Sequence, residues 1–159
     1  LINSRVGIEE ADGSNYISTD NMLPNRGGIK FGESNLPKVK TVNDYQKGDI
    51  LISNIRPYFK KIWFSDRKGT RSGDVLCFRV KDASLINKYL YCVLQSDQFF
   101  NYVVSTSKGT KMPRGDKKVI LDYEFELPDK EEQCKKYKPI MLIEKKLSLN
   151  NQINDNLAA

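Results

Sequence analysis

The sequence contains no histidine. This absence removes the residue on which the common catalytic triads, general bases and many zinc sites depend. Cysteine is also scarce: Cys77, Cys92 and Cys134 are far apart and form no CxxC pair, so neither a disulfide framework nor a zinc site is predicted. The phosphate-binding patterns GxxxxGK[ST] and GxGxxG are missing as well. These absences argue against most familiar enzyme classes and predict no bound cofactor and no metal.

Long apolar runs are also lacking. No stretch approaches the length of about 20 residues that a membrane span requires, and the N-terminus lacks the basic-then-apolar pattern of a signal peptide. We therefore expect no membrane partner and a reducing, cytoplasmic environment. The sequence begins at Leu1 without a Met, which favours a piece of a longer protein.

Positive charge is what the sequence has in excess. There are 26 Lys and Arg against 20 Asp and Glu, for a formal net charge of +6 and a pI near 9.1. Two segments hold this excess: residues 56–71 carry a net charge of +5 and residues 105–118 carry +4, which leaves −3 for the remainder. Charge concentrated in this way is typical of a surface that binds phosphates.

The first basic segment opens with a proline turn that presents Arg, aromatic and Lys groups together. Arg can bind a phosphate or a guanine edge with two hydrogen bonds, whereas Lys mainly supplies charge. A solvated hairpin is the alternative interpretation. The candidate binding residues for phosphates or base edges in this segment are Arg56, Tyr58, Lys60, Arg67, Lys68 and Arg71.

The second basic segment combines hydroxyls, glycines and cations. Glycine lets a backbone approach a ligand closely, and hydroxyls can donate to phosphate. A flexible loop is the alternative. Two such segments in one small domain favour nucleic acid, with DNA and RNA both open at this point. The candidates in this segment are Lys108, Gly109, Thr110, Lys111, Arg114 and Lys117.

The alternation of apolar runs and turns predicts an α+β, β-rich domain over residues 1–127. Mixed three- and four-residue apolar spacing over 87–104 predicts a bent helical pair packed against the strands, the second helix being capped by Ser96. The strands are expected at residues 50–52, 61–64, 75–80 and 124–127.

A separate helical region is expected over residues 128–159. Asp129 and Glu132 have the spacing of a capping box, and Pro139 should interrupt or kink the helix. One face of this helix carries two asparagines. Buried asparagine is costly in a core but is typical of the contact between paired helices. A helix that packs on its own domain is the alternative. The predicted subunit or dimer contacts on this face are Ile140, Ile143, Leu147, Asn150, Asn154 and Leu157.

Parts of the sequence are also consistent with three specific functions. Asp129 with Glu144 superficially resembles the carboxylates of a metal nuclease, but about 22 Å would separate them along a straight helix. An RNA or single-strand binding domain could stack bases on Tyr58, Phe59 and Trp63. A protein adaptor would work through the C-terminal helix alone.

Five stretches together resemble the specificity subunits of Type I restriction-modification systems. No single stretch is specific, but they occur in the family's order and spacing over nearly the whole chain. They are residues 48–58 (GDILISNIRPY), 73–76 (GDVL), 108–114 (KGTKMPR), 127–133 (LPDKEEQ) and 149–157 (LNNQINDNL).

The resemblance implies a non-catalytic target recognition domain (1–127) followed by a conserved spacer helix (128–159). It implies recognition of a half-site in double-stranded DNA. Methylation and cleavage would belong to modification and restriction subunits that bind S-adenosylmethionine, Mg²⁺ and ATP. Complete family members have two recognition domains and two paired helices, so this chain resembles half of one, which would pair with a second copy or a second half.

Overall fold

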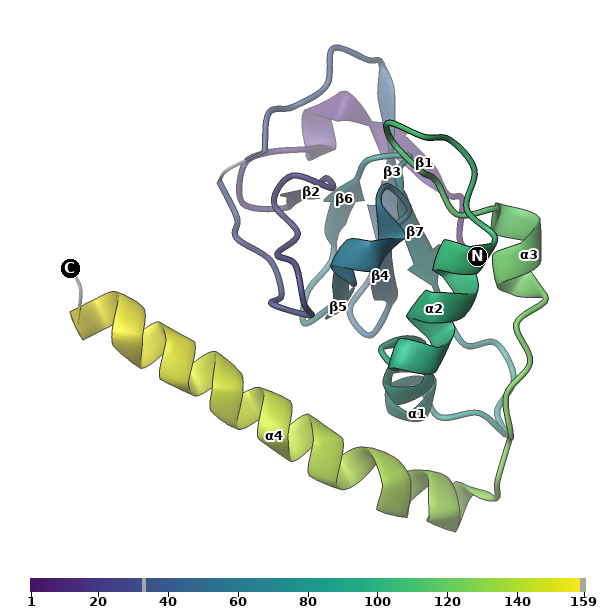
Figure 1. The fold of residues 1–159 in the computed structure, drawn as a ribbon. Helices are drawn as coiled ribbons and strands as arrows, with labels where there is room; N and C mark the ends of the chain where they lie inside the picture. Colours follow the sequence, from purple (N-terminus) through teal and green to yellow (C-terminus); the bar gives the residue numbers. More distant parts are fainter. Residues whose placement is uncertain (33, 158–159) are drawn as a thin grey trace. The chain divides into compact units, whose positions relative to one another are not determined.

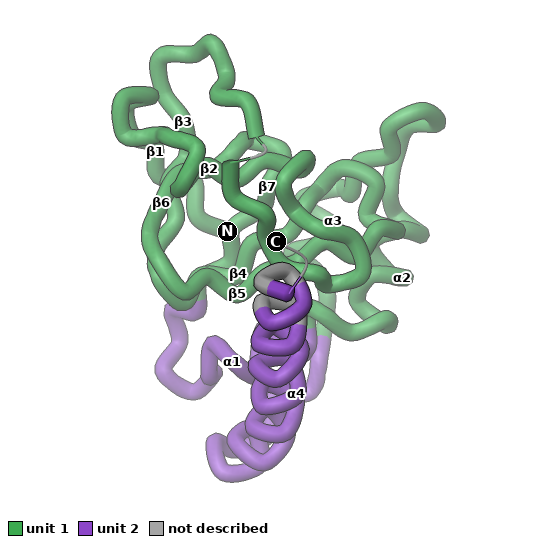
Figure 2. The backbone as a smooth tube through the Cα atoms, turned by 90° about the vertical axis from the view of Figure 1, so that its left-hand side faces the viewer, with its two compact units in different colours: residues 1–79, 94–124 green, residues 80–93, 125–159 purple. Residues whose placement is uncertain are grey.

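The computed structural model describes residues 1–32 and 34–157, apart from the side chains at 151, 152, 155 and 156. The chain divides into two compact units, shown in different colours in Figure 2. The first consists of residues 1–79 and 94–124, and the second of residues 80–93 and those from 125 onward. The structure therefore groups 80–93 with the C-terminal region, whereas the predicted functional division lies at 127/128. The last two residues of the predicted spacer, 158 and 159, lie outside the described residues.

Two small sheets form the first unit (Figure 1). In the three-stranded sheet, the central strand β4 pairs antiparallel with β5 and β7. The four-stranded sheet has the order β1-β3-β6-β2, with β2 parallel to β6 and the other pairs antiparallel. The strands are β1 (Arg5–Gly7), β2 (Tyr16–Ile17), β3 (Thr41–Tyr45), β4 (Ile50–Ser53), β5 (Ile62–Phe64), β6 (Gly69–Arg71) and β7 (Val75–Phe78).

The predicted strands at 50–52, 61–64 and 75–80 correspond to β4, β5 and β7, with ends that differ by one or two residues. All residues of β4 and β7 are buried, which explains why both are continuous apolar runs without alternation. Their side chains contribute to a core cluster of Ile17, Met22, Tyr45, Leu51, Val75 and Cys77, against which Phe31 and Trp63 pack. Trp63 therefore belongs largely to the core.

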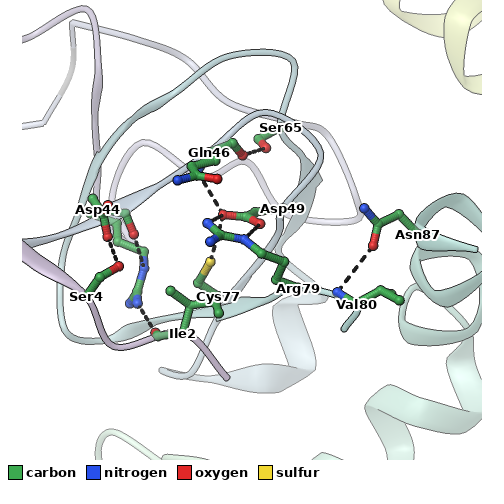
Figure 3. Close-up of polar contacts among 11 residues, drawn as sticks. Ile2, Ser4, Asp44, Gln46, Asp49, Ser65, Cys77, Arg79, Val80 and Asn87 are labelled. Carbon is green, nitrogen blue, oxygen red and sulfur yellow. Dashed lines mark hydrogen bonds and ion pairs between the residues drawn. The ribbon is translucent and has the colours of Figure 1, made fainter. Parts of the chain in front are cut away.

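An ion pair joins the ends of β4 and β7 (Figure 3). Asp49 lies directly before β4 and is 1% exposed. Its carboxylate accepts hydrogen bonds from Arg79, the residue directly after β7, through Nε at 2.7 Å and Nη2 at 2.6 Å. Burial alone would raise the pKa of Asp49, but hydrogen bonds from Arg79, the Gln46 amide and Cys77 hold it below its ordinary value. Burial raises the pKa of the Cys77 thiol to about 12, so this cysteine is unreactive.

The predicted helical pair is present as α1 (Asn87–Leu94) and α2 (Asp97–Ser105). Ser96 caps α2 as expected, because its hydroxyl accepts from the Phe99 amide at 3.1 Å. The sequence did not predict a further short helix, α3 (Lys117–Leu121), whose N-cap Asp116 accepts from the Lys118 amide at 3.0 Å. Within the first unit, Tyr102 of α2 donates to the carbonyl of Val119 in α3 at 2.9 Å.

The second unit is held together at the start of α4 (Lys130–Leu157). Gln133 is 1% exposed: its amide nitrogen donates to the carbonyls of Ser84 (2.9 Å) and Pro128 (2.8 Å), and its oxygen accepts from the Ile86 amide (2.9 Å). The Asp129 carboxylate caps the helix through the Glu132 amide at 2.8 Å, as predicted. Glu132 does not complete the capping box with its side chain, which pairs with Lys136 at 3.0 Å.

One expectation at the start of the C-terminal region is wrong, and another is contradicted in part. Residues 124–127 form no strand; instead Phe125 packs on Tyr89, and the Tyr89 hydroxyl donates to the Glu126 carbonyl at 3.0 Å. The alternation that indicated a strand thus comes from aromatic packing. Pro139 does not interrupt the helix, because α4 continues through it to Leu157. A kink at Pro139, the other effect expected of this proline, stays a prediction. None of the helices that the structure describes is both long and apolar enough to cross a membrane.

Candidate nucleic-acid interface

A left-handed turn presents the start of the first basic segment. We call residues 56–60 the arginine turn; its centre is the short 3₁₀ helix η2 (Pro57–Phe59). Pro57 occupies the first helical position, where its missing amide costs nothing. Arg56 (φ 50°) and Lys60 (φ 51°) flank the helix in the left-handed region. The Tyr58 and Phe59 rings, 4.7 Å apart, are 47% and 38% exposed, so they are surface groups of the turn.

An ordered hairpin forms the centre of the second basic segment. We call residues 108–114 the basic hairpin. The Lys108 amide donates to the Arg114 carbonyl, and the Arg114 amide donates to the Lys108 carbonyl, both at 2.9 Å. Gly109 has a φ of +99°, and a Cβ there would meet the Met112 carbonyl oxygen at 3.3 Å. Glycine is therefore required at this position, and the segment is a built hairpin that connects α2 to α3 (Figure 1).

The fold brings the arginine turn and the basic hairpin together. The Arg56 amide donates to the Pro113 carbonyl at 2.7 Å, and the Gly115 amide donates to the Asn54 carbonyl at 3.2 Å. Ile55 and Arg114 form an antiparallel bridge between these bonds. Arg56 and Pro113, which are 57 residues apart in the sequence, thus join the two segments into one surface.

The junction is also the place where buried polar atoms lack partners. Among the described residues, the buried side-chain atoms without a hydrogen-bond partner are Asn54 Oδ1 and Arg56 Nε. Unpaired buried polar atoms are uncommon in folded proteins. No other group of the described chain therefore forms a hydrogen bond with these two atoms at the junction.

Most cations of the basic hairpin face solvent. Lys108 pairs with Asp116 at 2.9 Å, and Arg114 pairs with Asp74 at 3.1 Å. Solvent screens exposed ion pairs of this kind, so a phosphate could compete for either cation. Thr110 and Lys111 are exposed, as is Lys117 at the start of α3.

Three predicted residues lie elsewhere. Arg67 and Lys68 follow β5, at the end opposite the arginine turn, and Arg67 pairs with the neighbouring Asp66 at 2.7 Å. Arg71 is 3% exposed, and its guanidinium donates to the carbonyls of Ile2, Asp44 and Val75. Because the Arg71 side chain is used inside the domain, we leave it out of the surface that we propose below.

One part of the surface was missed from the sequence. Residues 24–27 form a turn, and its Asn25 and Arg26 amides donate to the carbonyls of Phe59 (2.8 Å) and Lys60 (3.0 Å). The run Pro24-Asn25-Arg26-Gly27-Gly28 has the composition of a turn. That signal could have located the turn, but nothing local indicates that it contacts residues 59–60.

The apolar positions predicted for subunit contacts lie on α4 and are exposed. Ile140 is 36% exposed, Ile143 59%, Leu147 57% and Leu157 81%, and Asn150 and Asn154 are also exposed. A helix that packed this face on its own unit would bury it. Among the described residues, no group of three or more Cys, Asp or Glu is placed to hold a metal ion. In particular, Asp129 of the nuclease alternative is engaged as the α4 cap.

Two solved structures share this fold. The HsdS subunit from Thermoanaerobacter tengcongensis is 17% identical with a TM-score of 0.69, over 98% of this chain and 42% of that one. A chain from a structure of type I R-M system complex assembly and conformational transition is 17% identical with a TM-score of 0.70, over 99% of this chain and 43% of that one. This chain therefore spans less than half the length of either neighbour.

No curated protein matches the sequence. The family model of the Type I restriction modification DNA specificity domain matches residues 8–159, nearly the full length. The expected family is confirmed by this match, and the α+β fold with a long C-terminal helix agrees with both structural neighbours. The chain belongs to the Type I restriction modification DNA specificity domain family.

Proposed function

We propose that this chain recognises a short half-site in duplex DNA through the arginine turn and the basic hairpin, without catalysing a reaction. The observation that carries this proposal is the junction itself: the Arg56 amide bonds to Pro113, so both basic segments meet at one place. Phosphate contacts from Lys108 and Lys111 would position the chain. Arg56, Arg114 and Thr110 would read base edges, each good bidentate contact giving about 1–3 kcal/mol of discrimination.

Binding of labelled duplex DNA by the full chain tests this proposal. The variant Lys108→Ala/Lys111→Ala should bind more weakly. Its slope of log K against log salt should be shallower by about 1.8, which is about 0.9 for each phosphate that is no longer neutralised. Lys38→Ala/Lys40→Ala removes the same charge from another exposed loop and is the matched control. Equal weakening in both variants would mean that only net charge matters. A preference for single-stranded RNA in competition would favour the RNA-binding alternative.

We further propose that the chain directs modification and restriction subunits to its site. The family match supports this role, and the cofactors S-adenosylmethionine, Mg²⁺ and ATP would bind those partners. Mapping methylated adenines in the source cell tests the role. We expect one methylated motif that disappears when the gene is deleted; an unchanged pattern would contradict the proposal.

The exposed face of α4 would join this chain to a second copy or to a second half. Leu147 and Ile143, both more than half exposed, lie four residues apart and so on one side of the helix. Sedimentation equilibrium of the full chain should show a dimer that Leu147→Lys dissociates. Lys146→Ala, at the neighbouring exposed position, is the control. A wild-type chain that stays monomeric at high concentration would exclude pairing with a second copy.

A further inference from the structure

Left-handed backbone concentrates around the arginine turn. Among the described residues, the non-glycine positions with positive φ are Asn25 (54°), Arg26 (63°), Arg56 (50°) and Lys60 (51°). Arg56 and Lys60 flank η2, and Asn25 and Arg26 are bonded to Phe59 and Lys60. Such conformations are unfavourable for residues with a side chain and persist only where surrounding contacts hold them.

One carboxylate provides part of that restraint. Asp97, in the first turn of α2, accepts hydrogen bonds through the same oxygen, Oδ1, from Lys60 Nζ at 2.8 Å and Arg26 Nη2 at 2.5 Å. The helix packs against η2, so the carboxylate lies beside the turn. The Lys60 side chain is 27% exposed, whereas Lys108 in its pair with Asp116 is 81% exposed, so a phosphate reaches Lys60 much less readily than Lys108.

The two cations depend on Asp97 to different degrees. Arg26 also donates to the Gln95 carbonyl at 2.6 Å and lies 5.9 Å from the centre of the Phe100 ring. It would therefore stay in place if Asp97 lost its charge. Lys60 would lose its ion pair, and its ammonium would become available to another anion.

We propose that Asp97 is a specificity-determining positioning residue, which withholds Lys60 from DNA phosphates and thereby limits sequence-independent binding. This inference rests on the proposed function, since it needs the arginine turn to face DNA. Phosphate contacts supply essentially all non-specific affinity, so a cation that is held by a carboxylate lowers that affinity while base contacts are unaffected. The hydrogen bonds from Lys60 and Arg26 lower the pKa of Asp97 to about 2, so the carboxylate stays ionised at neutral pH.

Salt titration of binding to random-sequence duplex DNA tests the proposal on the full chain. Asp97→Asn should bind more tightly at low salt, and its plot of log K against log salt should be steeper by about 0.9, one extra phosphate contact. Between 50 and 200 mM salt, that slope makes the variant lose about 3.5-fold more affinity than the wild type. A merely structural role for Asp97 would make the variant bind more weakly instead.

A double-mutant cycle of Asp97 and Lys60 tests whether Lys60 is the cation that makes the extra phosphate contact. In this proposal the bond to Asp97 takes Lys60 out of the DNA-binding residues that the sequence predicted. Lys60→Ala alone should therefore leave the slope unchanged, and Asp97→Asn/Lys60→Ala should match Lys60→Ala. Asp97→Glu preserves the pair and should behave as wild type. The control Asp66→Asn removes the same charge and frees Arg67, outside the junction, so it should not reproduce the full slope increase.

Two results would overturn the inference while leaving the proposed function intact. One is that the wild-type chain binds duplex DNA, but the slope for Asp97→Asn is unchanged or shallower. The other is a slope that Lys60→Ala alone makes shallower by about 0.9, because Lys60 would then already contact phosphate. Failure of the wild type to bind any duplex at low salt would instead refute the proposed function, and the inference with it.

Discussion

The glycine beneath the junction gives a prediction that links packing to DNA binding. A Cβ added at Gly115 would lie 2.8 Å from Ile120 Cδ1, 2.9 Å from Asn54 Oδ1 and 2.9 Å from Val103 Cγ1. All three neighbours are no more than 4% exposed, so none can move into solvent. Overpacking of this kind typically costs about 1–3 kcal/mol. We expect Gly115→Ala to lower the free energy of unfolding by that amount in urea denaturation.

The same substitution should weaken DNA binding. Gly115 donates to the Asn54 carbonyl at 3.2 Å, next to the bond between Arg56 and Pro113, so a shift there would separate the arginine turn from the basic hairpin. Gly73→Ala is the matched control, because the nearest atom to its added Cβ is Asn43 Nδ2 at 3.9 Å. A Gly115→Ala chain with wild-type stability and wild-type affinity would refute the packing argument. Lower stability with unchanged affinity would show that the junction is not the binding surface.

Three further predictions concern stability. Arg79→Ala leaves the carboxylate of Asp49 buried without its ion-pair partner, so the free energy of unfolding in urea should fall by about 3 kcal/mol. This is near the lower end for a broken buried pair, because Arg79 is partly exposed. A decrease under about 1 kcal/mol would contradict the prediction. Gln133→Ala removes three hydrogen bonds and leaves the Ile86 amide unpaired, so we expect a destabilisation of about 2–3 kcal/mol and faster hydrogen exchange at residue 86; unchanged exchange would argue against it. The stabilisation from Asp97 should be complete above its ordinary pKa of 3.8 and lost as the pH falls toward about 2, so the difference in Tm between wild type and Asp97→Asn should shrink over that range; a constant difference would refute it.

The elements that could be predicted are those with a strong local signal. The buried runs of β4 and β7, the Ser96 cap of α2 and the Asp129 cap of α4 each depend on residues a few positions apart. The strands β1, β2, β3 and β6 were missed because none of them is an apolar run of three or more residues: β2 is two residues long, and the other three include polar or charged residues. Their pairing is also non-local: residues 16–17 of β2 pair with residues 70–71 of β6.

The candidate site was predicted as two charged segments, and the structure adds how they are arranged. Composition identified Arg56 and Lys108, but only the fold shows that their segments meet through the bond from Arg56 to Pro113. The burial of Arg71 and the ion pair of Lys60 with Asp97 could not be read from the sequence. Two of the three carbonyls that Arg71 contacts, those of Ile2 and Asp44, are 69 and 27 residues away, and Asp97 is 37 residues from Lys60. Charge patterning thus indicates which segments can bind an anion. It does not show which cations within those segments are available to that anion.

Selection of bound sequences from a random duplex library, followed by sequencing, tests the central claim most directly. The wild-type chain should enrich one short motif. Arg114→Ala should reduce the preference at specific positions of that motif, because an arginine that reads a base edge contributes about 1–3 kcal/mol there. Lys38→Ala should leave the motif unchanged. Enrichment of no motif by the wild type, or the same motif from Arg114→Ala and Arg56→Ala as from the wild type, would contradict sequence recognition by the arginine turn and the basic hairpin.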